Sequence, residues 1–365
     1  MAKKPRPRSW APYRSWLKRL VPPKWDLTRS SLVSCTMDDL PGGLSAVDLN
    51  QRNEEGYPPL VRALAARFGV ESERITSATG ATGAMFIALG ALLRPGDKVI
   101  VEWPSYDPIQ GAVRLLGGEV VDFSREWSDG FKPSSDNLAQ LVSHEVRAIV
   151  MTQPHDPSGV QMTRQELLEI GDLADAVGAK VVVDEVYADT LQGPGREPAA
   201  KLRDTFVSVR SLSKSYGLPG LRVGWLISDP ITAERAQRVR DLSEGVGCVP
   251  GERMGVLAVG QMDRLLERAQ EILTPNRKLL DAFVASRGEL EWVPPDGGAV
   301  AFPRLPDGWD SEELAHVAYK DFDVGVVPGH LFGYRRHFRV GFGGETSLLE
   351  GGLEALGRAI DRLSG

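Results

Sequence analysis

The sequence predicts an α/β fold, with a mostly parallel sheet that has helices on both faces and a smaller α+β domain at the C-terminal end. Three observations lead to this prediction. Apolar runs alternate with amphipathic helical stretches as far as Trp225, which is the order of strand–helix–strand units. These runs are apolar throughout, as in strands that are buried on both faces. After Trp225 long helical stretches dominate and strands become few, which indicates a second domain.

Composition is that of a soluble globular protein with room for a large core. The chain has 365 residues, of which 42% are hydrophobic and 25% are charged. A net charge of −6 argues against a general nucleic-acid binder. No apolar run approaches the length of a membrane span, so we expect no membrane segment. Cys35 and Cys248 lie far apart and lack metal-ligand spacing, which favours a reducing cytoplasm.

The first part of the chain supplies the expected sheet and its helices. Prolines 58 and 59 begin a helix that Gly69 ends, and Gly178 ends an amphipathic helix that begins at Arg164. We expect helices over 57–69, 80–93, 107–116, 137–143 and 164–177, and strands over 75–78, 98–102, 119–123, 148–152, 180–183, 205–209 and 223–227.

The second part of the chain is expected to be mainly helical. Helical patterns cover 230–244 and 254–273, and a further helix over 275–287 is kinked or restarted at Pro275. Strands are expected over 297–305 and 338–342, before a closing helix over 348–363. We therefore expect a large domain over 46–275 and a small C-terminal domain over 276–365.

Residues 1–45 are expected to form an N-terminal arm and part of the small domain. Trp10, Tyr13, Leu17 and Leu20 fall roughly on one helical face near the end of a basic stretch. This face predicts an arm that docks on its own subunit or on a partner subunit. A helix on a membrane surface is the alternative.

A small polar loop holds the first candidate for chemistry. Lys214 lies between two expected strands, among hydroxyl groups and glycines, with Arg222 eight residues further on. Such a loop suits a site that holds an anion and presents an amine. Lysine amines form Schiff bases with carbonyl compounds, pyridoxal 5'-phosphate (PLP) among them. From this loop alone, a structural lysine is an equally good interpretation.

Other candidates stand at strand ends, where ligands bind in parallel sheets. Gly80, Ala81 and Thr82 begin a helix whose free N–H groups suit a phosphate, although glycine-rich helix starts are common. Tyr106 follows a strand and could stack on a flat ring, or it could be an ordinary core or surface tyrosine. Asp184 ends an apolar strand, where a carboxylate is costly unless it is paired.

Seven motifs together resemble the fold-type-I, class I/II PLP-dependent aminotransferases. The resemblance spans about residues 50–363, and the motifs occur in the family's order and spacing. It implies a PLP-transferase large domain, a homodimer, and amino acid and 2-oxo acid substrates. The motifs are GATGAM from Gly80, WPSY ending at Tyr106, QPHDPSG around Asp156, VVVDEVY ending at Tyr187, SLSK ending at Lys214, GLRVGW around Arg222 and FRVGFG around Arg339.

The resemblance implies the following roles around the cofactor ring. Lys214 would bind the cofactor as a Schiff base and then act as acid and base at the substrate Cα. Asp184 would pair with the pyridine nitrogen and keep it protonated, so that the ring serves as an electron sink. Tyr187 would hydrogen-bond the ring hydroxyl, and Tyr106 would stack on the ring.

The resemblance also implies two anion sites. Ala81 and Thr82, with Gly80 at the helix start, would bind the cofactor phosphate together with Ser211 and Arg222. Arg339 would hold the substrate α-carboxylate in a bidentate pair. Without the resemblance, a surface arginine at a strand end would be the better interpretation of Arg339.

Two departures from the family's pattern stand out. Asp156 replaces an asparagine that normally donates a hydrogen bond to the cofactor's ring oxygen, and a carboxylate donates only when it is protonated. Its neighbour His155 could compensate, although we expect a solvent-facing histidine there. Many relatives also have a tyrosine that reaches the partner subunit's phosphate, where this chain has Asn50 and Gln51.

The leading functional prediction is transfer of an amino group between an L-amino acid and a 2-oxo acid. The alternative is PLP-dependent elimination, cyclisation or oxidation, because two stretches resemble enzymes that modify arginine derivatives, such as capreomycidine synthase. Asp38 and Asp39 could suit a basic substrate, but capping is the better interpretation of both. A binding or regulatory protein on this fold is a third class, which the presence of Lys214 disfavours.

Overall fold

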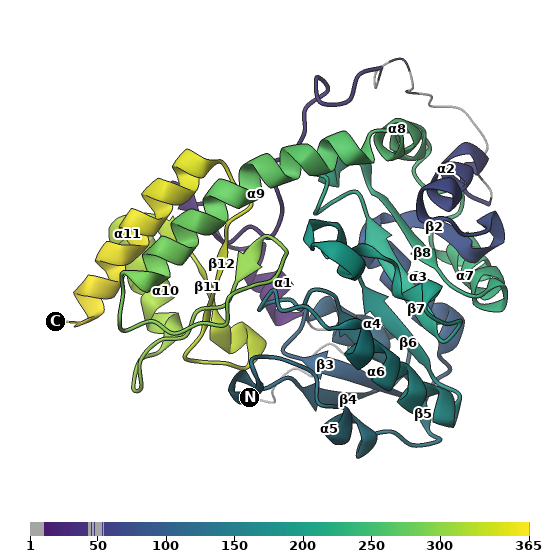
Figure 1. The fold of residues 1–365 in the computed structure, drawn as a ribbon, viewed down its shortest axis with the longest axis horizontal. Helices are drawn as coiled ribbons and strands as arrows, with labels where there is room; N and C mark the ends of the chain where they lie inside the picture. The colour runs from purple at the N-terminus through teal and green to yellow at the C-terminus, as the bar shows by residue number, and fades with distance from the viewer. Residues whose placement is uncertain (1–10, 43–44, 46, 48–52, 54, 365) are drawn as a thin grey trace, which may run out of the picture.

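A computed structural model describes residues 11–42, 45, 47, 53 and 55–364 of the chain. Its large domain is built on a seven-stranded sheet (Figure 1). Only β8 runs against its neighbours in this sheet, so the predicted α/β fold with a mostly parallel sheet is confirmed. In spatial order the strands are β2 (Ile75–Thr79), β8 (Val223–Ile227), β7 (Phe206–Ser211), β6 (Lys180–Asp184), β5 (Val146–Thr152), β3 (Lys98–Trp103) and β4 (Glu119–Ser124).

Helices cover both faces of this sheet because the strands carry apolar side chains on both sides. One apolar cluster joins one face to α3 (Gly80–Leu92), α4 (Pro108–Leu115) and α7 (Pro230–Ser243). On the other face lie α2 (Pro58–Phe68), α6 (Arg164–Val177) and α8 (Val249–Val259), with the short α5 (Ser135–Ala139) beside α6. A capping box between Thr163 and Glu166 begins α6, and Gly178 ends it with a φ of 72°.

The small domain pairs distant parts of the chain. β1 (Trp25–Asp26) runs parallel to β10 (Val324–Gly325), and β12 (Phe338–Gly341) lies between β11 (Val327–Pro328) and β9 (Val300–Ala301). Helices α10 (Ser311–Phe322) and α11 (Thr346–Ser364) pack on these strands around a second core (Figure 1). We did not predict α10, although Asp310 caps it and acidic residues fill its first turn.

A single helix, α9 (Met262–Ala285), connects the two cores. Leu265 and Leu266 pack in the large domain, whereas Leu280 and Val284 pack in the small domain. The helix continues through Pro275, so of the kink or restart expected there the restart was wrong, and the chain breaks at Gly260 and Gln261 instead. The boundary that we expected near Pro275 therefore falls inside a continuous helix.

The N-terminal arm docks on its own subunit. Helix α1 (Pro12–Leu17) buries Tyr13, whose backbone N–H donates to the Asp107 carboxylate over 2.7 Å. Tyr13 also packs against Phe332 of the small domain, with 5.6 Å between ring centroids. Trp10, which we placed on the same face, lies outside the described residues.

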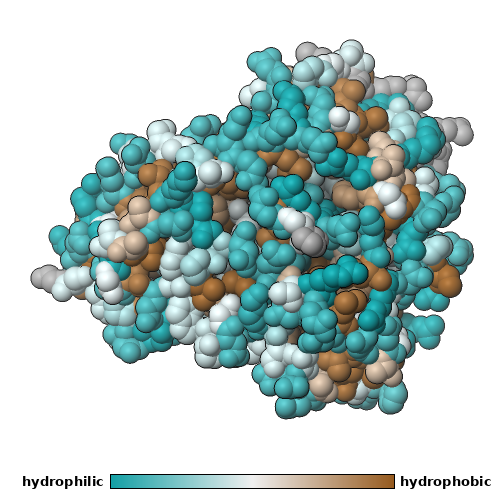
Figure 2. Space-filling view, viewed as in Figure 1, coloured by the Kyte–Doolittle hydropathy of each residue, from teal (hydrophilic) through white to brown (hydrophobic). Residues whose placement is uncertain are grey.

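The visible face of the molecule is mainly polar, with apolar residues in separate patches (Figure 2). Within the described residues, every helix is too short or too polar to cross a membrane.

Candidate active site

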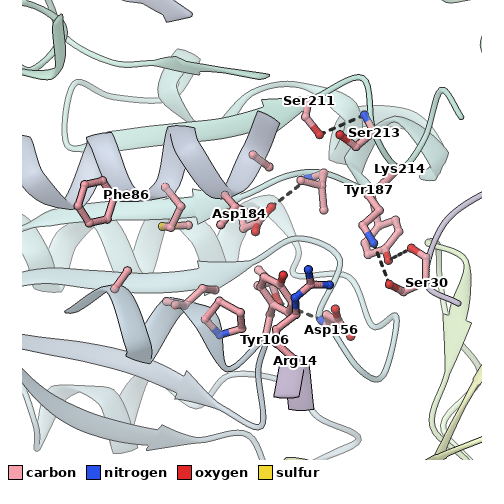
Figure 3. Close-up of a pocket in the computed structure, with 18 of the residues that line it drawn as sticks. Arg14, Ser30, Phe86, Tyr106, Asp156, Asp184, Tyr187, Ser211, Ser213 and Lys214 are labelled. Carbon is pink, nitrogen blue, oxygen red and sulfur yellow. Dashed lines mark hydrogen bonds between the residues drawn. The ribbon is translucent and has the colours of Figure 1, made fainter. Parts of the chain in front are cut away.

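A cavity of about 740 Å³ lies beyond the carboxyl ends of the parallel strands, and residues of the N-terminal segment line one side of it. Most of the residues predicted from the sequence meet there (Figure 3). The predicted site residues that line it are Ala81, Thr82, Tyr106, Asp156, Asp184, Tyr187, Ser211, Lys214 and Arg222.

Lys214 projects into the cavity from the loop between β7 and β8. Its amine donates to the Ser30 hydroxyl over 2.8 Å. Burial lowers the pKa of Lys214 to about 8, although the Asp156 carboxylate acts in the opposite direction. A substantial share of this amine is therefore neutral near pH 8, so it can attack a carbonyl or accept a proton.

Asp184 ends β6 and faces the same cavity (Figure 3). Its carboxylate accepts from the Val186 N–H over 3.2 Å, and burial raises its pKa to about 7. Among the described residues no basic side chain forms an ion pair with it. A buried carboxylate of this kind suits a ligand that brings its own cationic N–H group, as a pyridinium ring does.

Two tyrosines face the cavity near Lys214 and Asp184. Tyr187 is buried, and its hydroxyl donates to the Ser30 carbonyl oxygen. Burial raises the pKa of Tyr187 well above its usual value, and it raises the pKa of Tyr106 to about 12. Both phenols therefore stay protonated near neutral pH and remain hydrogen-bond donors.

The start of α3 carries the residues that we predicted to form a phosphate seat. Gly80 has a φ of 72°, which L side chains rarely adopt, and a Cβ there would lie 2.4 Å from Arg222 Nη2. Arg222 donates to the Thr79 and Pro219 carbonyl oxygens and, in the described part of the chain, has no carboxylate partner. Among the same residues, the buried Ser213 hydroxyl has no hydrogen-bond partner. A cation without a carboxylate partner and an unpaired hydroxyl fit the phosphate of PLP.

Arg339 lies behind the cavity wall rather than on it. Its guanidinium bonds Asp156 over 3.1 Å and donates to the Tyr13 hydroxyl, while no described residue accepts from its Nε. The ring of Tyr13 lies against the same guanidinium, 4.8 Å from ring centroid to Cζ. Asp156 thus joins Arg339 to the cavity that holds Lys214.

The expectation for His155 was wrong. Its side chain is 1% exposed, because Nε2 contacts the Pro104 carbonyl oxygen and Nδ1 contacts the Ser158 hydroxyl, each over 2.7 Å. Burial lowers its pKa well below the usual value, so this ring is a neutral brace for the loop that carries Asp156.

Two further expectations concern the rim of the site. Asp39 accepts from the Thr36 N–H over 2.8 Å and does not line the cavity, so it closes a turn rather than capping a helix or meeting a substrate there. Asn50 and Gln51 lie outside the described residues.

Sequence reasoning missed the residues that the N-terminal segment brings to the site. Tyr13 contacts Arg339, Arg14 lines the cavity, and Ser30 contacts both Lys214 and Tyr187. A helical pattern that placed Tyr13 on an apolar face was the only sequence signal. It carried no information on where that face would dock.

Comparison with protein families and curated proteins gives one consistent picture. A family model described as "Aminotransferase class I and II" matches residues 50–356. Capreomycidine synthase of Streptomyces vinaceus is 31% identical over 364 residues, which covers 96% of this chain and 93% of that protein. An aspartate aminotransferase of Streptomyces avermitilis is 26% identical over 318 residues, covering 81% and 78% respectively.

Solved structures with the same fold include enzymes of two kinds. A PLP-dependent aminotransferase from Streptococcus suis superposes with a TM-score of 0.91 at 28% identity, covering 99% of this chain and 98% of that one. The PLP-dependent cyclase OrfR superposes with a TM-score of 0.87 at 27% identity, with both chains fully covered.

Proposed function

This chain belongs to the aminotransferase class I and II family, whose cofactor is PLP, and we propose that it transfers an amino group from an L-amino acid to a 2-oxo acid. One observation carries the proposal. The amine of Lys214 and the unpaired carboxylate of Asp184 come from neighbouring strand ends and face one cavity. That pair is what PLP chemistry at an amino acid Cα requires.

The chain's own residues hold the cofactor in this proposal. The start of α3, with Ala81 and Thr82, binds the phosphate together with Ser211 and Arg222. Asp184 holds the proton on the ring nitrogen, and Tyr106 and Tyr187 contact the ring and its hydroxyl. When bound, PLP supplies a ring that takes up the electron pair left behind when the substrate's Cα–H bond breaks.

Other residues hold the substrate and move its proton. Arg339 binds the α-carboxylate, and Asp156 and Tyr13 fix the orientation of its guanidinium. Lys214 takes the Cα proton, which its pKa of about 8 permits, because a substantial fraction of the amine is neutral near pH 8. The buried ring of Tyr13 excludes water from the side of the small domain.

Cyclisation or elimination is the second candidate function, and two observations favour it. Asp156 brings a carboxylate to the cavity where the family pattern has a neutral amide. The relative that aligns over 96% of the chain is named capreomycidine synthase, and the structural relative OrfR is called a cyclase. In that reaction Lys214 would still remove the Cα proton, but no 2-oxo acid acceptor would be consumed.

Product analysis separates the two functions. The PLP-loaded enzyme is incubated with single amino acids, with and without a 2-oxo acid. Amino transfer predicts one 2-oxo acid per active site without acceptor, sustained turnover with acceptor, and no ammonia. Cyclisation or elimination predicts turnover without acceptor and loss of water or ammonia from the substrate.

Two lysine variants test the assignment of the proton-transferring group. Lys214→Ala should abolish turnover. Lys180→Ala should keep it, because Lys180 is bound to Asp229 at the opposite end of β6. Substantial amino transfer by Lys214→Ala would overturn the proposal.

A further inference from the structure

We propose that Arg14 selects substrates whose side chain ends in a second anionic group, a carboxylate or a phosphate. The inference rests on the proposed function, because it assumes that the α-carboxylate is held at Arg339. It concerns the side of the cavity that the N-terminal arm lines. None of the predicted site residues belongs to that arm.

Arg14 is held at the cavity wall by its neighbour in α1. Tyr13 is 2% exposed, donates its backbone N–H to Asp107, and accepts from Arg339 through its hydroxyl. These contacts fix the short helix on both domains and so hold the backbone of Arg14 beside the cavity. The Arg14 side chain lines the cavity and is itself exposed to solvent.

The side chain of Arg14 points into the cavity. Figure 3 shows it reaching from α1 toward Tyr106 and Asp156, on the side away from Ser211 and Ser213. The proposed phosphate seat is thus served by other groups, and Arg14 lies on the substrate's side of the cavity.

Arg14 forms no ion pair within the described part of the chain, although its charge acts on the buried Asp107 carboxylate. Its guanidinium also has no hydrogen bond there, whereas Arg339 is paired with Asp156. Its field reaches the reacting groups, because it adds to the lowering of the Lys214 pKa and opposes the rise that burial causes in the Tyr106 pKa. A distal carboxylate or phosphate would gain a charge-assisted hydrogen bond here, and a cationic side chain would be repelled.

Steady-state kinetics of the PLP-loaded enzyme test this inference. The donors are L-glutamate, L-aspartate and O-phospho-L-serine, with L-glutamine as the neutral control of matched shape and L-ornithine as the basic control. The variants are Arg14→Gln, Arg14→Lys, and Lys18→Gln as a charge-loss control outside the cavity. Comparing O-phospho-L-serine with L-glutamate and L-aspartate shows whether the second anionic group is a phosphate or a carboxylate.

We expect Arg14→Gln to lose about 10- to 100-fold in kcat/KM on the preferred anionic donor and at most about threefold on L-glutamine. Arg14→Lys should recover part of that loss, and Lys18→Gln should match the wild type. Equal losses on all donors, or a wild-type preference for L-ornithine, would overturn the inference.

A binding measurement separates this inference from the proposed function. Glutarate and butyrate differ by one carboxylate and do not react, so their affinities for the PLP-loaded enzyme can be measured by calorimetry. If amino transfer is absent but Arg14→Gln weakens glutarate about tenfold more than butyrate, the proposed function fails and the inference stands. Equal weakening of both ligands contradicts the inference, whatever the reaction.

Discussion

Asp184→Asn should stabilise the PLP-free protein at alkaline pH, although the same change removes the proposed anchor of the cofactor ring. Burial raises the pKa of Asp184 from 3.8 to about 7. A shift of about three units corresponds to about 4 kcal/mol. Because the side chain lines a cavity that water can enter, we halve this value to about 2 kcal/mol.

The pH dependence of this effect has a defined sign. The native protein holds the Asp184 proton to a higher pH than the unfolded chain does, so ionisation at Asp184 costs stability as pH rises from about 4 to about 7. Asparagine cannot ionise, and this part of the slope disappears. The variant should therefore gain little near pH 4 and about 2 kcal/mol above pH 7.

Urea denaturation of the PLP-free proteins at about pH 5 and about pH 8.5 measures the difference. Asp189→Asn is the matched control, because Asp189 bonds the buried Arg210 guanidinium over 3.2 Å. That variant should lose stability, since it weakens the pairing of a buried cation. An Asp184→Asn protein that is less stable than the wild type at pH 8.5 would refute the reasoning.

Two further predictions concern the phosphate seat and the departure at Asp156. Gly80→Ala should cost about 1–2 kcal/mol in stability and also weaken PLP binding, because the added methyl group displaces Arg222. Gly96→Ala is the control, because Gly96 has a φ of 92° but lies in open space. A spectroscopic titration should show unchanged PLP affinity in that control. Asp156→Asn should lower the pKa of Lys214, because Asp156 is the leading charge that favours the ammonium form of Lys214. The pH dependence of PLP capture by the PLP-free protein measures that pKa. An unchanged or higher pKa would contradict the assigned effect of Asp156.

The sequence predicted those parts of the candidate site that lie at the ends of strands. Lys214 lies between two apolar runs, and Asp184 ends a third, so the alternation of strands and helices alone brings them to one edge of the sheet. The motifs then predicted a phosphate seat at Gly80, which lies at the start of α3. Each of these predictions depends on local pattern and on the general geometry of parallel sheets.

The remaining features depend on contacts between segments that are distant in sequence. Tyr13 and Ser30 reach the site because the N-terminal segment crosses both domains, and no periodicity encodes where it docks. The prediction for His155 was wrong because its ring is buried with both nitrogens satisfied. The Pro104 carbonyl oxygen, distant in sequence, contacts one nitrogen, and the Ser158 hydroxyl contacts the other. In the small domain, β12 matches the strand expected over 338–342, whereas β1, β10 and β11 span two residues each, too few to produce a pattern in the sequence.

The central claim is that Lys214 is the residue that carries PLP. Borohydride reduction of the PLP-loaded enzyme makes the bond between cofactor and lysine permanent, and peptide mass spectrometry then identifies the lysine. We predict the phosphopyridoxyl group on the peptide that contains Lys214 and, without prior reduction, on no peptide. A modified lysine elsewhere, or an unmodified Lys214 in protein that retains its PLP absorbance, would contradict the account.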